Sequence, residues 1–293
     1  LSEPGWGTAW SYVDGRLPRY DLQQAGNVQR YIGLIGIYAA TRIQVPKAGP
    51  VFSLLRRHAT RLSRTIALFD ERERAMLPSG AAGGALGLTP KQRKELRRQR
   101  RRLSELGALT YRSLRQPAEI REAAELFMAL EDGGWKGARG TSLLAEPSVT
   151  TFARTMTRLM ARKSQISIES LELDGKPIAM GVVLECNHRA YFWKTAYDEA
   201  YADYSPGVQL ALELSERLMA RDDLVLTDSC ALAGHAMIER LWPQRIAVAD
   251  VFIPARGGDG VSFESAGRRE QARRALRAVA KKAFLAATRR RAV

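Results

Sequence analysis

Three consecutive segments of strand character constrain the fold of this chain more than any other feature. They are QISIESLEL (165–173), PIAMGVVLE (177–185) and AYFWKTA (190–196). The first alternates apolar and polar residues, a period of two that is typical of a strand with one buried face. Asp174-Gly175, the strongest short signal for a hairpin turn, separates the first two segments, and Asn187-His188 separates the last two. The sequence therefore predicts an antiparallel, three-stranded meander.

Helices and further strands surround this meander in a regular order. The expected elements are a strand at 108–114, helices from Pro117 and Pro147, the meander, a helix after Gly207, a strand at 224–228, a helix at 235–242 and a last strand at 245–253. The order from Ala108 is thus β-α-α-β-β-β-α-β-α-β. The closing strand–helix–strand run implies a right-handed crossover and a locally parallel pair of strands.

The part of the chain before Ala108 has weaker signals. Val51 to Leu77 carries a loose apolar stripe at helical spacing, and a Gly/Ala-rich linker occupies 78–88. Thr89 and Pro90 then suit the N-cap and first position of an arginine-rich helix, with Gly107 as the residue after its C-terminus. We expect this helix to lie on the surface as an arm.

The positive charge is concentrated in two segments. The net charge of the chain is +15; residues 91–102 contain eight basic and one acidic residue, and residues 268–293 contain ten basic and one acidic residue. The rest of the chain is close to neutral, which argues against a fold built to bind nucleic acid. The two basic segments, 91–102 and 268–291, are either solvated helix faces or contacts for RNA or another anionic polymer.

Several classes of protein receive no support from the sequence. No apolar run approaches the length of a membrane span, and Cys186 and Cys230 are far apart, as expected for reduced thiols in the cytoplasm. The sequence begins at Leu1, so a preceding segment can be missing. No P-loop, HExxH, paired CxxC, GxSxG or EF-hand pattern occurs, and we expect no metal.

The segment YDEAYADYSPGVQLALELSERLMA (197–220) places Ser205-Pro206-Gly207 directly before a helix. These turn residues either only separate two elements or prepare an anion site. A helix start presents unpaired N–H groups and a partial positive charge. Gly207 permits a close approach of the backbone, and the Ser205 side chain can cap the helix. From this segment alone, both interpretations remain open.

Four ordered motifs carry a resemblance to a known family. They are KQRKELRRQRRRLSELGAL, LEDGGWKGARGTSLL, YDEAYADYSPGVQLALELSERL and DSCALAGHAMIERLWPQRIAVAD. Over about Thr89 to Ile253 the chain resembles bacterial acetyltransferase-domain proteins of the GNAT superfamily, of the BioF-like type linked to cellulose and exopolysaccharide synthesis. These proteins are relatives of the Fem-type aminoacyl transferases. The common GNAT phosphate loop, Gln/Arg-x-x-Gly-x-Gly/Ala, is reduced here to the single Gly207.

The resemblance implies an α+β GNAT fold, in which helices flank a mixed, mostly antiparallel sheet. Because such proteins often have two GNAT-like halves, it also implies a division of the chain. The expected parts are 1–77 as a truncated or degenerate N-terminal half, 78–107 as linker and arginine-rich arm, 108–255 as the acyltransferase domain, and 256–293 as a basic helix or tail. We expect a chain without residues 1–77 to keep a folded core.

The implied activity is transfer of an acyl group, in particular acetyl, from acyl-CoA to an amine, with an amino sugar or a polysaccharide precursor as acceptor. One alternative is a Fem-like transferase that takes its group from aminoacyl-tRNA. A second alternative is a non-enzymatic basic adaptor that binds nucleic acid or an anionic polymer through the two basic segments.

The resemblance also assigns candidate site residues. The coenzyme A pyrophosphate would bind at Ser205, Gly207, Val208 and Gln209. Asp228 and His235 are candidates for proton transfer, with Glu185 as the next choice for the base. Asp228 can instead cap a turn, and His235 can be only a polar residue at a helix start.

Candidate acceptor contacts are Trp135 and Lys136, in a glycine-flanked loop between two helices, and Tyr197 at the end of the meander. Trp135 can stack on a sugar or acyl group, and Lys136 can attract an anionic acceptor. The alternatives are a loop anchored by a buried tryptophan and aromatic packing around Tyr197.

Overall fold

The computed structural model of the protein describes most of the chain. The described residues are 40–47, 50–61, 67–80, 84–232 and 234–254, with 265, 268–269, 271–273, 275–276 and 279–280. Two compact units are formed, a larger one that holds 73–246 and a smaller one that holds 8–72 and 247–293. The smaller unit combines segments from two parts of the sequence, whereas the expected division at 77, 107 and 255 follows chain order.

One mixed sheet of eight strands, in the order β1-β8-β2-β7-β6-β5-β4-β3, runs through the described residues. The strands are β1 (Ala40–Pro46), β2 (Ala67–Pro78), β3 (Leu109–Leu114), β4 (Ile166–Leu173), β5 (Lys176–Cys186), β6 (Arg189–Tyr197), β7 (Leu226–Asp228) and β8 (Gln244–Pro254). The sequence of elements from β3 onward is the one predicted for a GNAT fold, and that fold class is confirmed.

The predicted meander is strands β4, β5 and β6, which pair antiparallel in chain order. Asp174 and Gly175 have φ values of 50° and 76°, and Asn187 and His188 have φ values of 48° and 59°. Positive φ at both central residues is the requirement of a type I′ hairpin turn, whose twist matches that of the strands. Both predicted turns are therefore confirmed.

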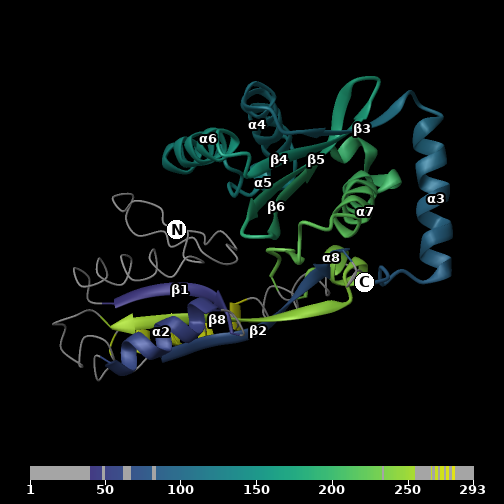
Figure 1. Ribbon diagram of the computed structural model, residues 1–293. Helices are drawn as coiled ribbons and strands as arrows, with labels where there is room; N and C mark the ends of the chain where they lie inside the picture. Colours follow the sequence, from purple (N-terminus) through teal and green to yellow (C-terminus); the bar gives the residue numbers. More distant parts are fainter. Residues whose placement is uncertain are drawn as a thin grey trace. The chain divides into compact units, whose positions relative to one another are not determined.

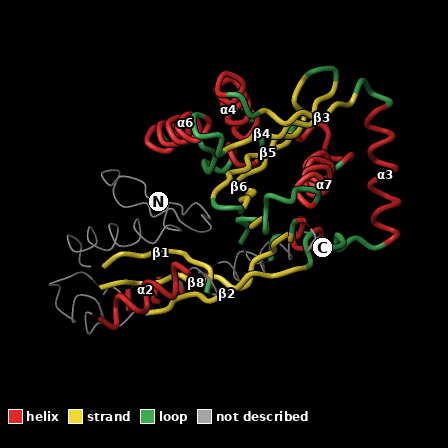
Figure 2. Tube along the Cα trace, in the orientation of Figure 1, coloured by secondary structure: helices red, strands yellow, loops and turns green. Residues whose placement is uncertain are grey.

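Helices cover both faces of strands β3 to β6 in the larger unit (Figures 1 and 2). Helices α4 (Pro117–Asp132) and α6 (Pro147–Ala161) pack on one face, and α7 (Pro206–Met219) packs on the other. Phe127 of α4 is fully buried against the first face, and Leu210 of α7 is fully buried against the second. This three-layer arrangement is what allows the meander to be buried on both sides.

A β-bulge interrupts the pairing of β5 with β6. Val182 is opposite Lys194 and Val183 is opposite Phe192, so Trp193 is the extra residue in β6. Trp193 lies with Phe127 on the α4 face, and the adjacent Lys194 contacts Glu131 of the same helix. The bulge thus directs two consecutive side chains to one face, which a regular strand cannot do.

Helix α3 (Pro90–Ser104) begins as predicted. The Thr89 hydroxyl accepts a hydrogen bond from the Gln92 N–H, and the Gln92 side chain accepts one from the Thr89 N–H, which is a capping box. The predicted end is wrong, because the helix stops at Ser104 and is capped by Glu105 in a right-handed conformation. Leu103 of α3 is fully buried, while most of the arginines are exposed.

The predicted helix from Val51 to Leu77 is correct only in its first half. Helix α2 (Pro50–Arg61) is present, but 67–78 form strand β2. The sequence of β2 does not show the apolar–polar alternation of a strand, because the charged side chain of Arg74 points into the core and pairs there with Asp228. Ala75 and Leu77 of the same strand are also fully buried in the larger unit.

The parallel pair of strands also differs from expectation. Strands β6 and β7 are parallel, joined through α7, whereas β8 pairs antiparallel with β1. Strand β2 pairs antiparallel with β7, through Met76 and Asp228 among others, and lies between β7 and β8 in the sheet order. A strand from early in the chain therefore takes the position that the local strand–helix–strand pattern had suggested for β8.

The smaller unit contains β1, α2 and parts of β2 and β8. Asp250 of β8 is fully buried and pairs with Arg72 at 3.5 Å, and Lys47 pairs with Glu71. The expectations for 1–39 and for the basic segment 268–291 lie wholly or largely outside the described residues. Among the described residues, no helix is both long and apolar enough to cross a membrane.

Candidate functional site

The end of strand β6 lacks a partner on one edge. Strand β7 pairs with β6 only from Arg189 to Tyr191 and ends at Asp228, while β6 continues to Tyr197. Within the described chain, no strand pairs with that edge of β6 beyond Tyr191. Backbone groups there are available to a ligand, since a sheet edge presents unpaired N–H and C=O groups.

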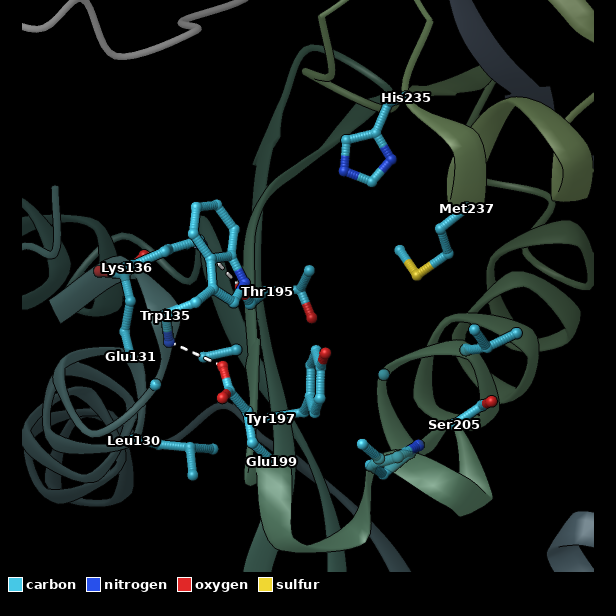
Figure 3. A pocket seen from close by; sticks show the side chains of 16 residues that line it. Leu130, Glu131, Trp135, Lys136, Thr195, Tyr197, Glu199, Ser205, His235 and Met237 are labelled. Atoms are coloured by element: carbon cyan, nitrogen blue, oxygen red, sulfur yellow. Dashed lines mark hydrogen bonds and ion pairs between the residues drawn. The ribbon is translucent and has the colours of Figure 1, made fainter. Parts of the chain in front are cut away.

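A cavity of about 340 Å³ opens beside this unpaired edge. Its lining comes from the end of α4, the short helix α5 (Trp135–Ala138), the end of β6, the 3-10 helix η2 (Glu199–Tyr204), the start of α7 and the start of α8 (Ala236–Leu241). Figure 3 shows Trp135 and Lys136 on one side, with His235 and Met237 across the cavity from them and Tyr197 and Ser205 lower in the view. The cavity therefore collects side chains from six separate elements.

Glu131 and Lys136 line the cavity, and Lys194, which does not line it, completes an ion cluster with Glu131. Glu131, 2% exposed, accepts hydrogen bonds through Oε1 from Lys136 at 2.9 Å and from Lys194 at 2.8 Å. Its Oε2 accepts from the Leu143 N–H at 2.9 Å, and Lys136 Nζ also donates to the unpaired carbonyl of Thr195 at 2.9 Å. With one negative and two positive groups, this cluster has a net positive charge.

The pKa values of this cluster follow from its burial and charges. Burial opposes ionisation of Glu131, but the positive charges of Lys194 and Lys136 outweigh it and hold the pKa of Glu131 below its ordinary value. Burial lowers the pKa of Lys194, and the charge of Lys136 adds to this effect against the opposing charge of Glu131. The Lys136 ammonium group is held by hydrogen bonds to the Glu131 carboxylate and to the Thr195 carbonyl of β6.

Replacing Glu131 with Gln is expected to lower the free energy of unfolding by about 1.5–3 kcal/mol at neutral pH, because charged hydrogen bonds are lost. A carboxyl with a lowered native pKa stabilises the fold above its unfolded pKa, and that stability is lost as the pH falls through the native pKa. The difference between the two proteins should therefore shrink towards pH 3.

Urea denaturation at several pH values measures this effect. The matched control is Glu125→Gln on the same helix, whose pair with Arg154 is 43% exposed on both sides and is expected to contribute less than about 1 kcal/mol. A pH-independent difference for Glu131→Gln would contradict the assignment of its ionised form.

The loop between α4 and α6 holds Trp135 at the cavity mouth. A Cβ on Gly137 would lie 1.8 Å from the Asp132 carbonyl oxygen, so this turn requires glycine. The Trp135 N–H donates to Glu199 Oε1 at 2.7 Å, and its ring is 45% exposed, with the Arg139 guanidinium 5.0 Å from its centroid. Trp135 is therefore not the buried anchor that was the alternative interpretation.

The start of α7 lies at the same cavity. Ser205 is in the left-handed conformation (φ 52°, ψ 51°), and its side chain does not cap the helix, contrary to prediction. Its carbonyl accepts from the N–H groups of Val208 at 2.9 Å and Gln209 at 3.0 Å, and Pro206 has no N–H. Among the described groups, the Gly207 N–H is left without an acceptor in this first turn.

His235 lines the cavity from the N-cap of α8. Its Nδ1 accepts a hydrogen bond from the Ile238 N–H at 3.5 Å. In a neutral ring with an accepting Nδ1, the proton is on Nε2. With this tautomer, His235 can donate a hydrogen bond toward the cavity.

The structure brings together seven of the nine predicted site residues. The cavity is lined by Trp135, Lys136, Tyr197, Ser205, Gly207, Val208 and His235. Asp228 does not line it; its carboxylate is 1% exposed, pairs with Arg74 at 3.1 Å and accepts from the Cys230 N–H. Gln209 is also buried outside the cavity and donates to the Leu96 carbonyl at 2.9 Å, which ties α7 to α3.

The reserve candidate for the base, Glu185, lies outside the cavity as well. It pairs with Arg221 at 2.7 Å and with Arg115 at 2.9 Å, and its pKa is lowered because these positive charges outweigh its burial. The cavity lining also includes Glu131, Glu199 and Met237, which were not predicted. Glu131 had a signal, since it follows Phe127 by four residues on the apolar face of α4, where a carboxylate is unexpected.

Comparison with known proteins agrees with this fold. Residues 90–227 match the family model described as "Acetyltransferase (GNAT) domain", a match that begins with helix α3. No curated protein matches the sequence significantly.

Three solved structures that have a similar fold share little sequence identity with this chain. A conserved protein of unknown function from Bacteroides thetaiotaomicron VPI-5482 has 11% identity and a TM-score of 0.46, covering 70% of this chain and 76% of that one. A GCN5-related N-acetyltransferase from Kribbella flavida has 11% identity and a TM-score of 0.40, covering 87% and 80%. PaiA N-acetyltransferase from Thermoplasma acidophilum, in complex with coenzyme A, has 16% identity and a TM-score of 0.29, covering 38% and 72%.

The strand order and the family match define the class of this molecule. The protein is a transferase with a GNAT fold, and residues 90–227 match the GNAT acetyltransferase domain.

Proposed function

We propose that the protein transfers an acyl group from acyl-CoA to an amine, and that the 340 Å³ cavity is the transfer site. The observation that carries the proposal is the unpaired end of β6, which opens into a cavity at the start of a helix. An extended pantetheine arm can pair with a free strand edge as a peptide does. The pyrophosphate would then lie at Gly207, where an N–H is free and the helix start favours negative charge.

The transfer itself needs two proton movements. The amine nitrogen attacks the thioester carbonyl carbon, the C–S bond breaks, the amine loses a proton and the thiolate gains one. The Nε2–H of a neutral His235 can donate a hydrogen bond to the developing thiolate, and the proton taken from the amine can then pass to the sulfur. Glu199, whose Oε1 is held by the Trp135 N–H, is the carboxylate best placed to accept the proton from the amine.

For the acceptor we propose a ring-bearing amine with an acidic group, such as an amino sugar of a polysaccharide precursor. Trp135 presents an exposed ring at the cavity mouth, and such rings stack on flat, apolar faces of sugars and similar groups. The net positive cluster of Lys136, Lys194 and Glu131 favours an anionic group beside the amine. A role of the BioF-like kind in exopolysaccharide synthesis fits this acceptor.

Replacing Gly207 with Val is expected to weaken acetyl-CoA binding by about 10- to 100-fold, which is about 1.4–2.8 kcal/mol. A Cβ at Gly207 would lie 3.3 Å from Cδ1 of Tyr197, so the larger side chain would occupy the space beside the free N–H. Isothermal titration calorimetry with acetyl-CoA measures the change, and a thermal melt checks the fold.

The control is Gly140→Ala, at a glycine in the α5–α6 loop with open space around its Cβ position. Its positive φ of 64° makes that substitution somewhat destabilising, but coenzyme affinity should remain unchanged. A folded Gly207→Val protein with wild-type affinity for acetyl-CoA would refute this coenzyme site.

The Fem-like alternative is favoured by one observation, the exposed basic face of α3. Lys94, Arg97 and Arg101 are exposed there, and Arg98 pairs with Glu95. Titration with acetyl-CoA and with RNA at two salt concentrations separates the proposals, because binding to phosphates weakens steeply with salt. Salt-sensitive RNA binding without acetyl-CoA binding would favour the aminoacyl-tRNA reaction or a basic adaptor.

A further inference from the structure

Helix α3 differs in charge from the rest of the larger unit. Residues 91–102 contain eight basic residues and one acidic residue, a net charge of +7. Residues 103–246, which make up most of that unit, contain 16 basic and 20 acidic residues, a net charge of −4. The unit therefore carries one strongly positive helix on a slightly negative body.

Two of the arginines hold α3 on this body. Arg93 donates to the Leu88 carbonyl at 3.2 Å and to the Leu86 carbonyl at 3.0 Å. Arg100 pairs with Glu213 of α7 at 3.4 Å. These contacts determine which face of the helix is turned to the body, and because side chains point outward all around a helix, the opposite face is left to solvent.

The outward face of α3 is a basic strip, which consists of five exposed residues: Lys94, Arg97, Arg98, Arg101 and Arg102. The steps from Lys94 to Arg97 and on to Arg101 are three and four residues, so these three side chains share one side of the helix over about 10 Å. Two acidic residues lie beside the strip, where Glu95 pairs with Arg98 and Glu105 pairs with Arg101. A net charge of +3 remains, and none of the five residues lines the 340 Å³ cavity.

The shape and composition of the strip favour a flat anionic partner over a nucleic acid strand. Proteins that follow a single strand combine a positively charged groove with aromatic side chains that stack on the bases. The strip lies on the convex outer side of one helix, contains no aromatic residue, and adjoins a body of net negative charge. A row of cations is sufficient for a membrane surface, because each Lys or Arg near anionic lipids adds to the attraction.

An apolar residue accompanies the strip. Leu106 follows Arg102 by four residues, directly after the end of the helix, and is 51% exposed. Phosphate groups gain nothing from such a side chain, whereas the boundary between lipid head groups and acyl chains accepts leucine beside lysine and arginine.

We propose that the basic strip of α3 docks the protein on the surface of a membrane that contains anionic lipids. The charged ends of the strip lie among the lipid phosphates, and Leu106 enters the boundary below them. The contact is reversible and depends on salt, since it is mainly electrostatic. It depends on α3 and Leu106 alone and does not rest on the proposed acyl transfer.

The first experiment is cosedimentation of the full chain with vesicles of phosphatidylcholine, alone or with about one third phosphatidylglycerol. We expect binding to the anionic vesicles that weakens with salt, and none to the neutral ones. The triple variant Lys94→Gln, Arg97→Gln and Arg101→Gln is expected to bind about 100-fold more weakly, because three of the attracting charges are lost. A thermal melt checks the fold of each variant.

The matched control removes three exposed arginines from α4 and the end of α6, through Arg121→Gln, Arg158→Gln and Arg162→Gln. It lowers the net charge by the same amount and is expected to bind nearly as well as wild type. Equal losses in the two triple variants would show attraction to the overall charge and would overturn the docking surface. Unchanged binding of the α3 variant would assign the contact to another basic segment, such as 268–293, and would overturn it as well.

The second experiment tests the lipid as the partner. Leu106→Ser should weaken binding to anionic vesicles about 3- to 10-fold, while Leu126→Ser, at a leucine of α4 that is 52% exposed, leaves it unchanged. No difference between these two variants would overturn the insertion of Leu106. Duplex RNA is the competing ligand: tighter binding of RNA than of the vesicles, lost in the α3 variant and kept in Leu106→Ser, would overturn the membrane and assign the strip to nucleic acid.

Discussion

Replacing Arg74 with Met is expected to lower the free energy of unfolding by about 3–5 kcal/mol, because it leaves the Asp228 carboxylate buried without its partner. Both side chains are 1% exposed, and the Arg74 guanidinium donates to both carboxylate oxygens, at 3.1 and 3.3 Å. Loss of this much stability would unfold many single domains. Urea denaturation followed by circular dichroism measures the loss.

The double variant Arg74→Met with Asp228→Leu tests the cause. It removes both charges and is expected to recover much of the stability lost in the single variant, since two apolar side chains can replace a buried ion pair. Arg112→Met is the control, because that arginine is 54% exposed. It would lose only ion pairs with Glu119 and Glu172, whose N–O distances are 3.8 Å. No recovery in the double variant would mean that the packing of Arg74, not its charge, stabilises the strand.

The same variants decide the catalytic role predicted for Asp228. If the carboxylate is structural, Asp228→Asn lowers the amount of folded protein, while the turnover of the folded fraction stays near that of wild type. If it transfers protons, the folded fraction loses turnover by about 100-fold or more. Activity normalised to folded protein distinguishes the two results.

The meander could be predicted because its signals are local. Asp174-Gly175 specifies a turn by itself, and the alternation of the flanking segments specifies which face is buried. The capping box at Thr89 and Gln92 is equally local, as two residues three apart satisfy each other. Such features depend on neighbours in the sequence and require no knowledge of the tertiary structure.

Strand β2 could not be predicted, because the interaction that stabilises it joins residues far apart in the sequence. Arg74 makes the segment look like an exposed helix, and only the pairing with Asp228, 154 residues later, makes an arginine acceptable in the core. Ala75 and Leu77 complete the same core, so the expectation that residues 1–77 can be removed without loss of the fold is not supported. A cut after residue 77 would remove the partner of β7.

Only part of the candidate site was predicted, because some of its signals are local in the sequence and others depend on distant contacts. The turn at Ser205 and Gly207 has a local signal, and the resemblance supplied His235 and Trp135. The pairing of Lys194 with Glu131 depends on the bulge in β6, which no pattern in the sequence indicated. The resemblance also favoured Asp228 as an acid or base, although in the structure it pairs with Arg74 outside the cavity.

Replacing His235 with Asn is expected to lower the turnover of acyl transfer by about 100- to 1,000-fold, if the Nε2–H donates a hydrogen bond to the departing thiolate. His235 also caps α8 through Nδ1, so a change to Ala would remove two functions at once. Asn is a good N-cap residue and keeps the helix start while it removes the ring. The pair His235→Asn and His235→Ala thus separates catalysis from capping.

The thiol of the donor tests the proposed hydrogen bond more directly than turnover alone. A thioester of an acidic thiol, such as an acetyl thiophenyl ester, releases a weakly basic thiolate that needs little stabilisation by a hydrogen-bond donor. The defect of His235→Asn should therefore be large with acetyl-CoA and small with the aryl thioester, while the affinity for acetyl-CoA, measured by calorimetry, changes little. Equal defects with both donors would show that His235 acts on the amine or the carbonyl oxygen, and wild-type turnover of His235→Asn would leave it only the role of a helix cap.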